Sequence, residues 1–419
     1  MTTDRFGHAI DPACGYAWGT VLRSHDDEVR RMLAGRALIR TRVAAHGDDA
    51  VYNMTGLIRA FPLRPDDLAG LTSQLGFYAR FTDEAEELVL KHMGGDPGRH
   101  AAAILTRVSA AMLAVMLALD IRGRRVLSLI PGGRSHPSIG KAVELVGGTF
   151  EEVTGVAALA DRLQHARPDL LVISPITPQK YHLPAPQVRE AAAFARARGI
   201  TVFLDDAHMA SRLAFFDEPP ALAPGDADLA VWSLDKHVDG PRAAAIAGDR
   251  ALVERVRTKA FEYGLEAQSG HYVAAVRALE QFDVGRVREV AQMAYPLLEV
   301  ARRTFGDMAY LAGPGVAVSG EDVVSWALAR RGLRATRVVP NEAVSAASFA
   351  MLREHGLVTI PSVGMPGAAA TFRLMVYPDG PRLGLDGFAR AIDTAATVLA
   401  EGIHDPALVE RAIFGEGTR

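Results

Sequence analysis

The segment VWSLDKHVDGPRAAAIAG, residues 231–248, places one lysine between two apolar runs that are typical of buried strands. Lys236 follows Ser233 by three residues and precedes Arg242 by six. A lysine amine that is reachable and partly desolvated has a lowered pKa, so it can attack an aldehyde and form a Schiff base. A solvated lysine in a turn is the alternative interpretation, and it is the commoner one for a single lysine. Other residues must decide between the two.

The segment LTRVSAAMLA, residues 105–114, runs from an apolar stretch into the start of a helix. The backbone N–H groups and the dipole at such a helix start can bind phosphate, and the hydroxyls of Thr106 and Ser109 can add hydrogen bonds. Arg107 lies between them and completes this candidate phosphate site. The alternative is that Ser109 serves only as the N-cap of the helix.

Two more polar residues come just after predicted strands. His136, in PGGRSHPSIG, precedes a helix and could lie over a flat aromatic ring; it could also be a capping or surface histidine. Asp205, in VFLDDAHMASR, ends an apolar strand, where a carboxylate is costly unless it is paired. A protonated ring nitrogen would be a suitable partner and would keep the carboxylate ionised. The alternative is that Asp205 or Asp206 caps a helix.

Together these residues meet the requirements of pyridoxal 5'-phosphate (PLP). This cofactor needs a phosphate site, a group that stacks on its ring, an acid that pairs with its ring nitrogen and a lysine that binds its aldehyde. The chain supplies them in the order 106–109, His136, Asp205 and Lys236. Four weak signals in the right order weigh more than any of them alone.

The elements around these residues alternate between short apolar runs and helical patterns. Strands are expected at 101–106, 125–130, 169–174, 201–205, 228–233 and 243–248, with helices at 84–95, 109–120, 136–148 and 187–199. This alternation predicts an α/β fold in which helices cover both faces of a mainly parallel sheet, and ligands bind beyond the carboxyl ends of its strands. After about residue 285 longer helices are expected at 287–305, 321–332 and 341–356, then a strand at 370–378 and a last helix from near Leu385. The predicted domains are an N-terminal segment (1–80), a large α/β domain (81–285) and a smaller C-terminal α+β domain (286–419).

The composition narrows the class of protein. The 419 residues are 49% hydrophobic and 23% charged, as in a soluble globular protein, and the net charge of −3 disfavours a general binder of nucleic acids or anionic membranes. The single cysteine, Cys14, excludes an intramolecular disulfide and a cysteine-based metal cluster, and no metal site is predicted. No signal peptide or membrane-spanning run is visible, so we expect a cytoplasmic protein.

The sequence resembles the fold type I PLP-dependent enzymes, the aspartate aminotransferase superfamily, over residues 50–400. The order of the four site segments is the order found in that superfamily. The stretch from LDDAHMASR to SLDKHVDGPRAAAIAGD, together with VYNMTGLIRAF, FEYGLEAQSG and VGMPGAAATFRLMV, is most similar to its selenocysteine-synthase-like branch, including archaeal members. The resemblance implies a seven-stranded type of sheet in the large domain. It also implies a homodimer or a higher homo-oligomer with shared active sites, in which the N-terminal segment packs on the small domain and the partner subunit.

The resemblance also implies roles for individual residues. Lys236 would hold the cofactor and move the substrate α-proton, Asp205 would pair with the pyridine nitrogen, and His136 would stack on the ring. The remaining implied roles are phosphate binding by Thr106, Arg107, Ser109, Ser233 and Arg242, contacts near the phenolic oxygen by His208 and Thr177, binding of the substrate carboxylate by Arg373, and contacts to a neighbouring subunit's site by Tyr52 and Asn53. At the position of His208 the selenocysteine-synthase branch often has a small residue. Arg373 suits a carboxylate because its planar fork donates two hydrogen bonds, and its alternative is a structural ion pair.

Several reactions fit this set of residues. We expect α-proton removal from a small amino acid, followed by loss or replacement of a β-group, because His136 is typical of lyase-like and aldolase-like relatives whereas aminotransferases usually have an aromatic residue there. Transamination is the first alternative. A transfer-RNA-directed reaction of the selenocysteine-synthase kind is the second, although nucleic acid is an unexpected partner for a chain of this charge. A protein that binds the cofactor without catalysis is the third.

Overall fold

The computed structural model describes residues 2–12, 14–72 and 74–416, and these residues form two compact units. One unit comprises residues 57–287, and the other combines the described residues up to 56 with those from 288 onward. The chain therefore passes between the units twice, at 56/57 and at 287/288. The predicted domain boundaries were 80/81 and 285/286.

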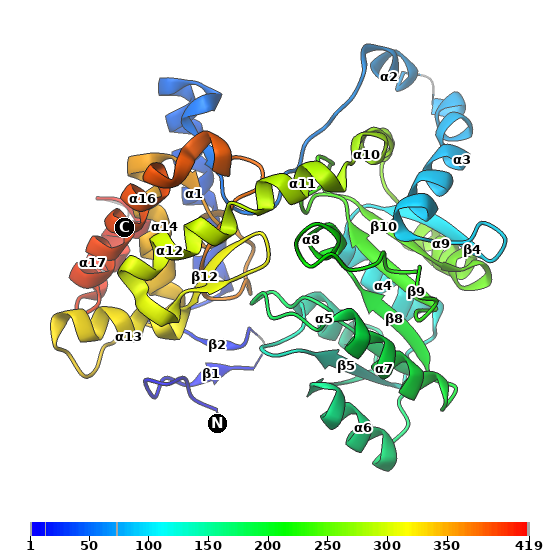
Figure 1. Cartoon of the computed structure of the whole chain (residues 1–419), viewed down its shortest axis with the longest axis horizontal. Coiled ribbons are helices and arrows are strands. Elements are labelled where there is room, and N and C mark those ends of the chain that lie inside the picture. Colours follow the sequence, from blue (N-terminus) through cyan, green and yellow to red (C-terminus); the bar gives the residue numbers. More distant parts are fainter. Residues whose placement is uncertain (1, 13, 73, 417–419) are drawn as a thin grey trace. The chain divides into compact units, whose positions relative to one another are not determined.

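The unit of residues 57–287 is built on a seven-stranded sheet with the order β4-β10-β9-β8-β7-β5-β6 (Figure 1). Its strands are β4 (His100–Leu105), β5 (Arg125–Ile130), β6 (Thr149–Thr154), β7 (Leu170–Ile173), β8 (Thr201–Asp205), β9 (Leu229–Ser233) and β10 (Ala244–Asp249). The pairs from β9 through β8, β7 and β5 to β6 are parallel, while β10 is antiparallel to both β4 and β9. The prediction of a mainly parallel seven-stranded sheet is confirmed.

Helices cover both faces of this sheet, because successive residues of its central strands point to opposite sides and are apolar on both. Leu127 and Leu129 pack with one face's helices, and Val126 packs with the other's. The first face holds α3 (Gln74–Met93), α6 (Val156–His165), α7 (Ala185–Arg196), α8 (Met209–Phe215) and α10 (Ser269–Gln281), and the second holds α4 (Val108–Ala118), α5 (Pro137–Leu145) and α9 (Arg250–Tyr263). The short helix α2 (Pro65–Gly70) precedes α3.

The predicted strands of this unit and the helices predicted at 109–120, 136–148 and 187–199 are found within a few residues of their expected positions, whereas α3 begins ten residues before the expected residue 84. Strand β6 and helices α2, α6, α8, α9 and α10 were not predicted. Helix α4 begins at Val108 with Arg107 as its N-cap, so the prediction that Ser109 caps this helix is wrong; Ser109 is its second residue. The predicted end of α3 is confirmed, because Gly94 follows Met93 with a φ of 71° that favours glycine.

The other unit is α+β. Its three-stranded antiparallel sheet has the order β11-β12-β14, formed by β11 (Tyr310–Leu311), β12 (Gly315–Ser319) and β14 (Thr371–Met375), and two strand pairs join β1 (Ile10–Asp11) to β2 (Tyr16–Ala17) and β13 (Leu357–Val358) to β3 (Tyr52–Asn53). Its helices are α1 (His25–His46), α12 (Ala294–Phe305), α13 (Gly320–Arg331), α14 (Pro340–His355), α15 (Ile360–Val363), α16 (Gly380–Gly402) and α17 (Pro406–Phe414), with short 3₁₀ turns at Asp48–Ala50 and Gly306–Met308.

Two predicted helices of the C-terminal region differ in detail from the structure. The single helix expected at 287–305 is divided into α11 (Val284–Ala291) and α12, because Pro296 lacks an N–H and its ring would clash with a continuous helix; it lies in the first turn of α12 instead. Helix α16 has a break at Gly384, whose φ is 68°, so its regular part begins at Leu385, as predicted. Among the described residues, no helix is long and apolar enough to cross a membrane.

Candidate functional site

The strand register brings several of the predicted site residues to one edge of the large sheet. Leu105, Ala244 and Ser233 lie in one row across β4, β10 and β9, and Asp205 ends the neighbouring strand β8. The loops after β4, β7, β8 and β9 therefore start at the same carboxyl edge, where open parallel sheets bind ligands. We call five residues at this edge the Lys236 cluster: Thr177, Lys180, Asp205, His208 and Lys236.

Asp205 is a buried carboxylate whose hydrogen-bonding capacity is only partly used. Its side chain is 6% exposed, and Oδ1 has no hydrogen-bond partner among the described residues. Oδ2 accepts a long hydrogen bond of 3.4 Å from the hydroxyl of Ser174. Burial raises the pKa of Asp205 to about 6, against the opposing charge of Lys236 and the amide of Ala207. Helix α8 has His208 as its N-cap, so the capping alternative for Asp205 is excluded.

Lys236 is half-buried and lies beside His208 rather than in open solvent. Its Nζ is 3.3 Å from Nε2 of His208. Its charge also influences the pKa values of Asp205 and His136, so residues from three separate loops meet around this amine. The interpretation as a solvated turn lysine is therefore wrong.

Lys180 is a member of the cluster that the sequence analysis missed. Its side chain is buried, and its Nζ lies 3.1 Å from Nδ1 and 3.2 Å from Nε2 of His208. It belongs to a tight turn in which its amide donates to the carbonyl of Thr177 and the amide of Thr177 donates to the carbonyl of Tyr181. A lysine in such a turn reads as a solvated residue in sequence, and no spacing rule connects it to His208.

Thr177 supplies a second unused polar atom. The residue is fully buried, and its Oγ1 has no hydrogen-bond partner among the described residues. A buried hydroxyl without a partner costs about 1–3 kcal/mol, so such atoms are rare unless a ligand or water completes them. Thr177 and Asp205 thus both have polar atoms that are available to a bound group.

His136 caps helix α5 and is held neutral. Its Nδ1 accepts a 3.2 Å hydrogen bond from the amide of Ser138, so the capping role considered for it is observed. Desolvation, followed by the positive charges of Lys236, Arg107 and Lys141, lowers the pKa of His136 to about 3. A neutral, flat imidazole can also lie over an aromatic ring, and that role stays a prediction.

The predicted phosphate site lies at the start of α4. Thr106, Arg107 and Ser109 are all partly exposed there, and the first N–H groups of the helix have no partner within it. Ser233 ends β9, but its hydroxyl donates to Oδ1 of Asp235 at 2.7 Å, and this bond competes with a role in phosphate binding. Arg242 is half-buried and stands two residues before β10 at the same edge.

The neighbours of Lys236 are buried and paired rather than solvated. Asp235 accepts from Ser233, and its Oδ2 lies 3.5 Å from Nε of Arg59. His237 is buried, with Nδ1 3.1 Å from the hydroxyl of Ser211. These contacts hold the backbone on both sides of Lys236.

Three predicted substrate residues belong to the other unit. Arg373 lies on β14, where burial lowers its pKa to about 10 and Tyr310 acts in the opposite direction. The side chain of Asn53 accepts from the amide and hydroxyl of Thr55 at 3.1 and 2.6 Å, which gives it a local structural role. The ring of Tyr52 has the guanidinium of Arg382 4.0 Å above its centre. The roles of Arg373, Tyr52 and Asn53 toward a substrate stay predictions.

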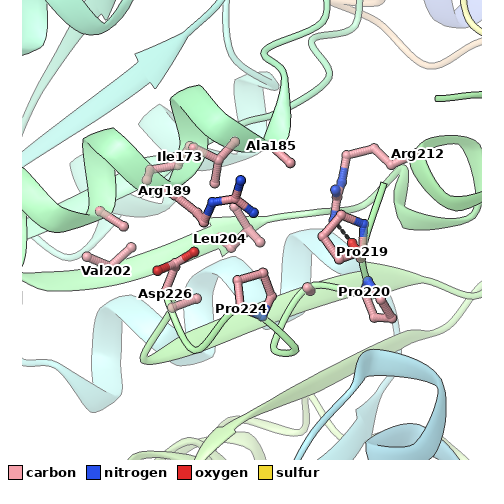
Figure 2. Close-up of a pocket in the computed structure, with 14 residues that line it drawn as sticks. Ile173, Ala185, Arg189, Val202, Leu204, Arg212, Pro219, Pro220, Pro224 and Asp226 are labelled. Atoms are coloured by element: carbon pink, nitrogen blue, oxygen red, sulfur yellow. Dashed lines mark hydrogen bonds between the residues drawn. The ribbon is translucent and has the colours of Figure 1, made fainter. Parts of the chain in front are cut away.

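A separate cavity lies between α7, β8 and the loop at 219–227, and no member of the Lys236 cluster lines it (Figure 2). Most of its lining is apolar, including Val188, Val202 and Leu204. Figure 2 shows Arg212 at one end of it, donating to the carbonyl of Pro219 at 3.1 Å. The polar groups converge at the Lys236 cluster instead, so we take that cluster as the candidate active site.

Comparisons with known proteins show the family to which this chain is similar. A family model described as the UPF0425 C-terminal domain matches residues 312–379. A UPF0425 pyridoxal phosphate-dependent protein of Methanothermobacter thermautotrophicus is 32% identical over 391 residues, which are 93% of this chain and 98% of that protein. A protein of the same description from Methanococcus maripaludis is 26% identical over 350 residues, 83% of this chain and 92% of its own length.

Solved structures show the same fold. The alanine–glyoxylate aminotransferase of Nostoc sp. has a TM-score of 0.55 at 14% identity, covering 83% of this chain and 94% of its own. A double mutant of the aspartate aminotransferase of Thermus thermophilus has a TM-score of 0.54 at 15% identity, covering 87% and 96%. The predicted fold type I architecture is confirmed.

Proposed function

Because the chain belongs to the UPF0425 pyridoxal phosphate-dependent protein family, we propose that it is an enzyme that binds PLP at the Lys236 cluster and acts on the α-carbon of a small amino acid. When bound, PLP is an electron sink that stabilises negative charge at that carbon. The proposed reaction is α-proton removal followed by loss or replacement of a β-group.

The observation that carries this proposal is the unused Oδ1 of Asp205. Both oxygens of a buried carboxylate next to a lysine normally form an ion pair or accept hydrogen bonds from backbone amides. Oδ1 of Asp205 nevertheless has no partner among the described residues. A protonated ring nitrogen is the kind of group that completes it, and it would keep the carboxylate ionised. The hydroxyl of Thr177, which has no hydrogen-bond partner among the described residues, and the start of α4 meet two further needs of PLP, a donor near the ring and a phosphate site.

The other residues take roles that their surroundings support. Lys236 would bind the cofactor aldehyde and carry the α-proton, with His208 beside its amine. His136, held neutral, would stack on the ring without adding a charge to it. Thr106, Arg107 and Ser109 would bind phosphate, with Ser233 and Arg242 as helpers, and Arg373 would bind the substrate carboxylate.

The choice of reaction rests on two supports. The flat neutral His136 is typical of lyase-like relatives, and the segments around Lys236 resemble the selenocysteine-synthase-like branch, whose chemistry is at the β-carbon. A homodimer in which Tyr52 and Asn53 reach the neighbouring site is part of the same proposal, and light scattering of the purified protein tests it.

Spectra of the purified protein test the proposal. We expect a yellow protein near neutral pH. Its visible absorbance should be absent from Lys236→Ala and retained in the control Lys259→Ala, which changes a partly exposed helix lysine that pairs with Glu262 at 2.7 Å. A colourless protein that ignores added PLP would contradict the whole proposal.

A screen of amino acids then identifies the reaction. Release of ammonia, sulfide or another β-group with unchanged cofactor spectrum supports elimination or replacement. Conversion to the pyridoxamine form with release of an oxo acid would show transamination instead. Tight binding of bulk transfer RNA in a gel shift at physiological salt would favour a transfer-RNA-directed reaction.

A further inference from the structure

Lys180 stands in a position that lysine does not favour. Its φ is 71°, in the left-handed region where glycine and asparagine are the usual residues. A side chain there costs of order 1 kcal/mol, and such strain persists where the surrounding structure requires it. The side chain is also only 8% exposed, although a lysine usually keeps its amine in water. Two independent costs are thus accepted to place this amine where it is.

The amine of Lys180 contacts the same imidazole as that of Lys236. Both lie within 3.3 Å of Nε2 of His208, at 3.2 Å for Lys180 and 3.3 Å for Lys236. Lys180 is also 3.1 Å from Nδ1, and such nearly equal distances to the two ring nitrogens place its amine over the ring rather than on the in-plane lone pair of either nitrogen. Two ammonium groups against one imidazole repel each other. A protonated imidazole would add a third positive charge. The arrangement is balanced when one amine is charged and the other is neutral.

We propose that Lys180 is a positioning residue which keeps its charge beside His208 and thereby keeps the amine of Lys236 neutral and nucleophilic. This inference rests on the proposed function, because a cofactor-binding lysine reacts as the free amine. Lys180 itself makes no bond to cofactor or substrate in this proposal; it acts through the field and through His208.

Other charged groups lie near Lys236. Asp205, at the end of β8, favours the charged amine because the two opposite charges interact. Arg107, at the start of α4, acts on His136, as Lys236 does. His136 is neutral and contributes little. Asp206 and Glu218 share the guanidinium of Arg212, and Asp206 also raises the pKa of Asp205. Asp235 lies next to Arg59. Lys180 supplies the positive charge that offsets Asp205.

Competitive labelling of the cofactor-free protein tests the inference. Trace acetylation at a series of pH values, read by mass spectrometry of the peptide that contains Lys236, gives the midpoint at which this amine becomes reactive. In Lys180→Met we expect the midpoint to rise by about one pH unit or more, which slows labelling near neutral pH about tenfold. Lys180→Arg keeps the charge and should restore the wild-type midpoint.

Two further variants make the result decisive. Lys180→Asn is neutral and tolerates a positive φ, so it keeps the fold and should match Lys180→Met. Lys141→Met removes an exposed lysine of α5 and should leave the midpoint unchanged. An unchanged midpoint in the folded Met and Asn variants, or an Arg variant that behaves like Met, would overturn the inference. Failure of the proposed function alone gives a different result: the protein takes up no PLP, but the labelling midpoint of Lys236 still changes when Lys180 is substituted.

Discussion

Asp205 and Asp206 are neighbours in sequence, yet they belong to two regions with opposite character. Asp205 joins the Lys236 cluster and leaves one oxygen without a partner among the described residues. Asp206 joins what we call the Arg212 network, formed by Asp206, Arg212, Glu218 and the carbonyl of Pro219. There Nε of Arg212 donates to Oδ1 of Asp206 at 2.9 Å, Nη2 donates to Oδ2, and Nη1 donates to Glu218 at 2.9 Å.

This difference distinguishes buried polar groups that stabilise the fold from buried polar groups that are available to a ligand. In the Arg212 network the guanidinium donates hydrogen bonds to both carboxylates, and burial of the set is tolerated because each ion has a hydrogen-bonded partner of opposite charge. In the Lys236 cluster Oδ1 of Asp205 and Oγ1 of Thr177 have no hydrogen-bond partner among the described residues. We infer that matched charges hold the loop after β8 in place, and that the unmatched atoms await a ligand.

The largest expected effect is a loss of unfolding free energy when the Arg212 network is broken. Asp206→Asn leaves the guanidinium of Arg212, whose side chain is 4% exposed, with one carboxylate instead of two. Breaking a buried pair of this kind costs about 3–5 kcal/mol of unfolding free energy. Urea unfolding measures the loss, and Asp205→Asn is the matched control one residue away. Equal destabilisation of the two variants would contradict the distinction between the Arg212 network and the Lys236 cluster.

Asp205→Asn should instead lose activity while the fold is retained. Asparagine cannot stabilise a protonated ring nitrogen by charge, and loss of one such electrostatic contact lowers the rate by about 10²–10³-fold. Turnover of the substrate found in the screen, together with PLP affinity, measures the loss. Activity within a factor of two of the wild type would show that Asp205 is not the partner of the ring.

The pH dependence of stability tests the same residue without cofactor. The pKa of Asp205 rises from 3.8 in the unfolded chain to about 6 in the folded protein, so the folded state binds more protons between pH 4 and 6. Stability therefore falls as the pH rises through this window, by about 3 kcal/mol in total at about 1.4 kcal/mol per unit.

The comparison that isolates this contribution is between wild-type and Asp205→Asn protein, both free of PLP. The variant should be the more stable one above pH 6, and the difference should vanish toward pH 4. Melting temperatures across the range measure it. A constant difference between the two proteins would mean that Asp205 does not titrate there.

The smallest effect concerns hydroxyl groups. Thr177→Val should cost little or no stability in the cofactor-free protein, because Oγ1 has no partner among the described residues to lose, whereas Ser233→Ala should cost about 1 kcal/mol because it removes the bond to Asp235. Thermal melts measure both. A larger loss of stability in Thr177→Val than in Ser233→Ala would show that the Thr177 hydroxyl has a structural partner.

The strands that position the site could be predicted because they are short continuous apolar runs, which only a sheet covered on both faces buries. Strand β6 could not, because its sequence TFEEVT has neither an apolar run nor a clean alternation, as befits the edge of the sheet. Asp205 could be predicted because it ends an apolar strand, and Lys236 because it follows the end of another by three residues. Lys180 could not, because its contact with His208 spans 28 residues and depends on a turn conformation that the residue type disfavours.

The antiparallel placement of β10 has a consequence for how the lysine is presented. Parallel neighbours in this sheet are joined by crossovers that contain helices, whereas β9 and β10 are joined by residues 234–243 alone, and the amide of Leu234 donates to the carbonyl of Ala243 at 2.9 Å. Closing so short a loop costs little chain entropy. The distant residue Ile58 adds a backbone hydrogen bond of 2.7 Å to the carbonyl of Asp235. Lys236 is therefore held in place by the protein itself, and capture of a cofactor does not have to meet that entropic cost again.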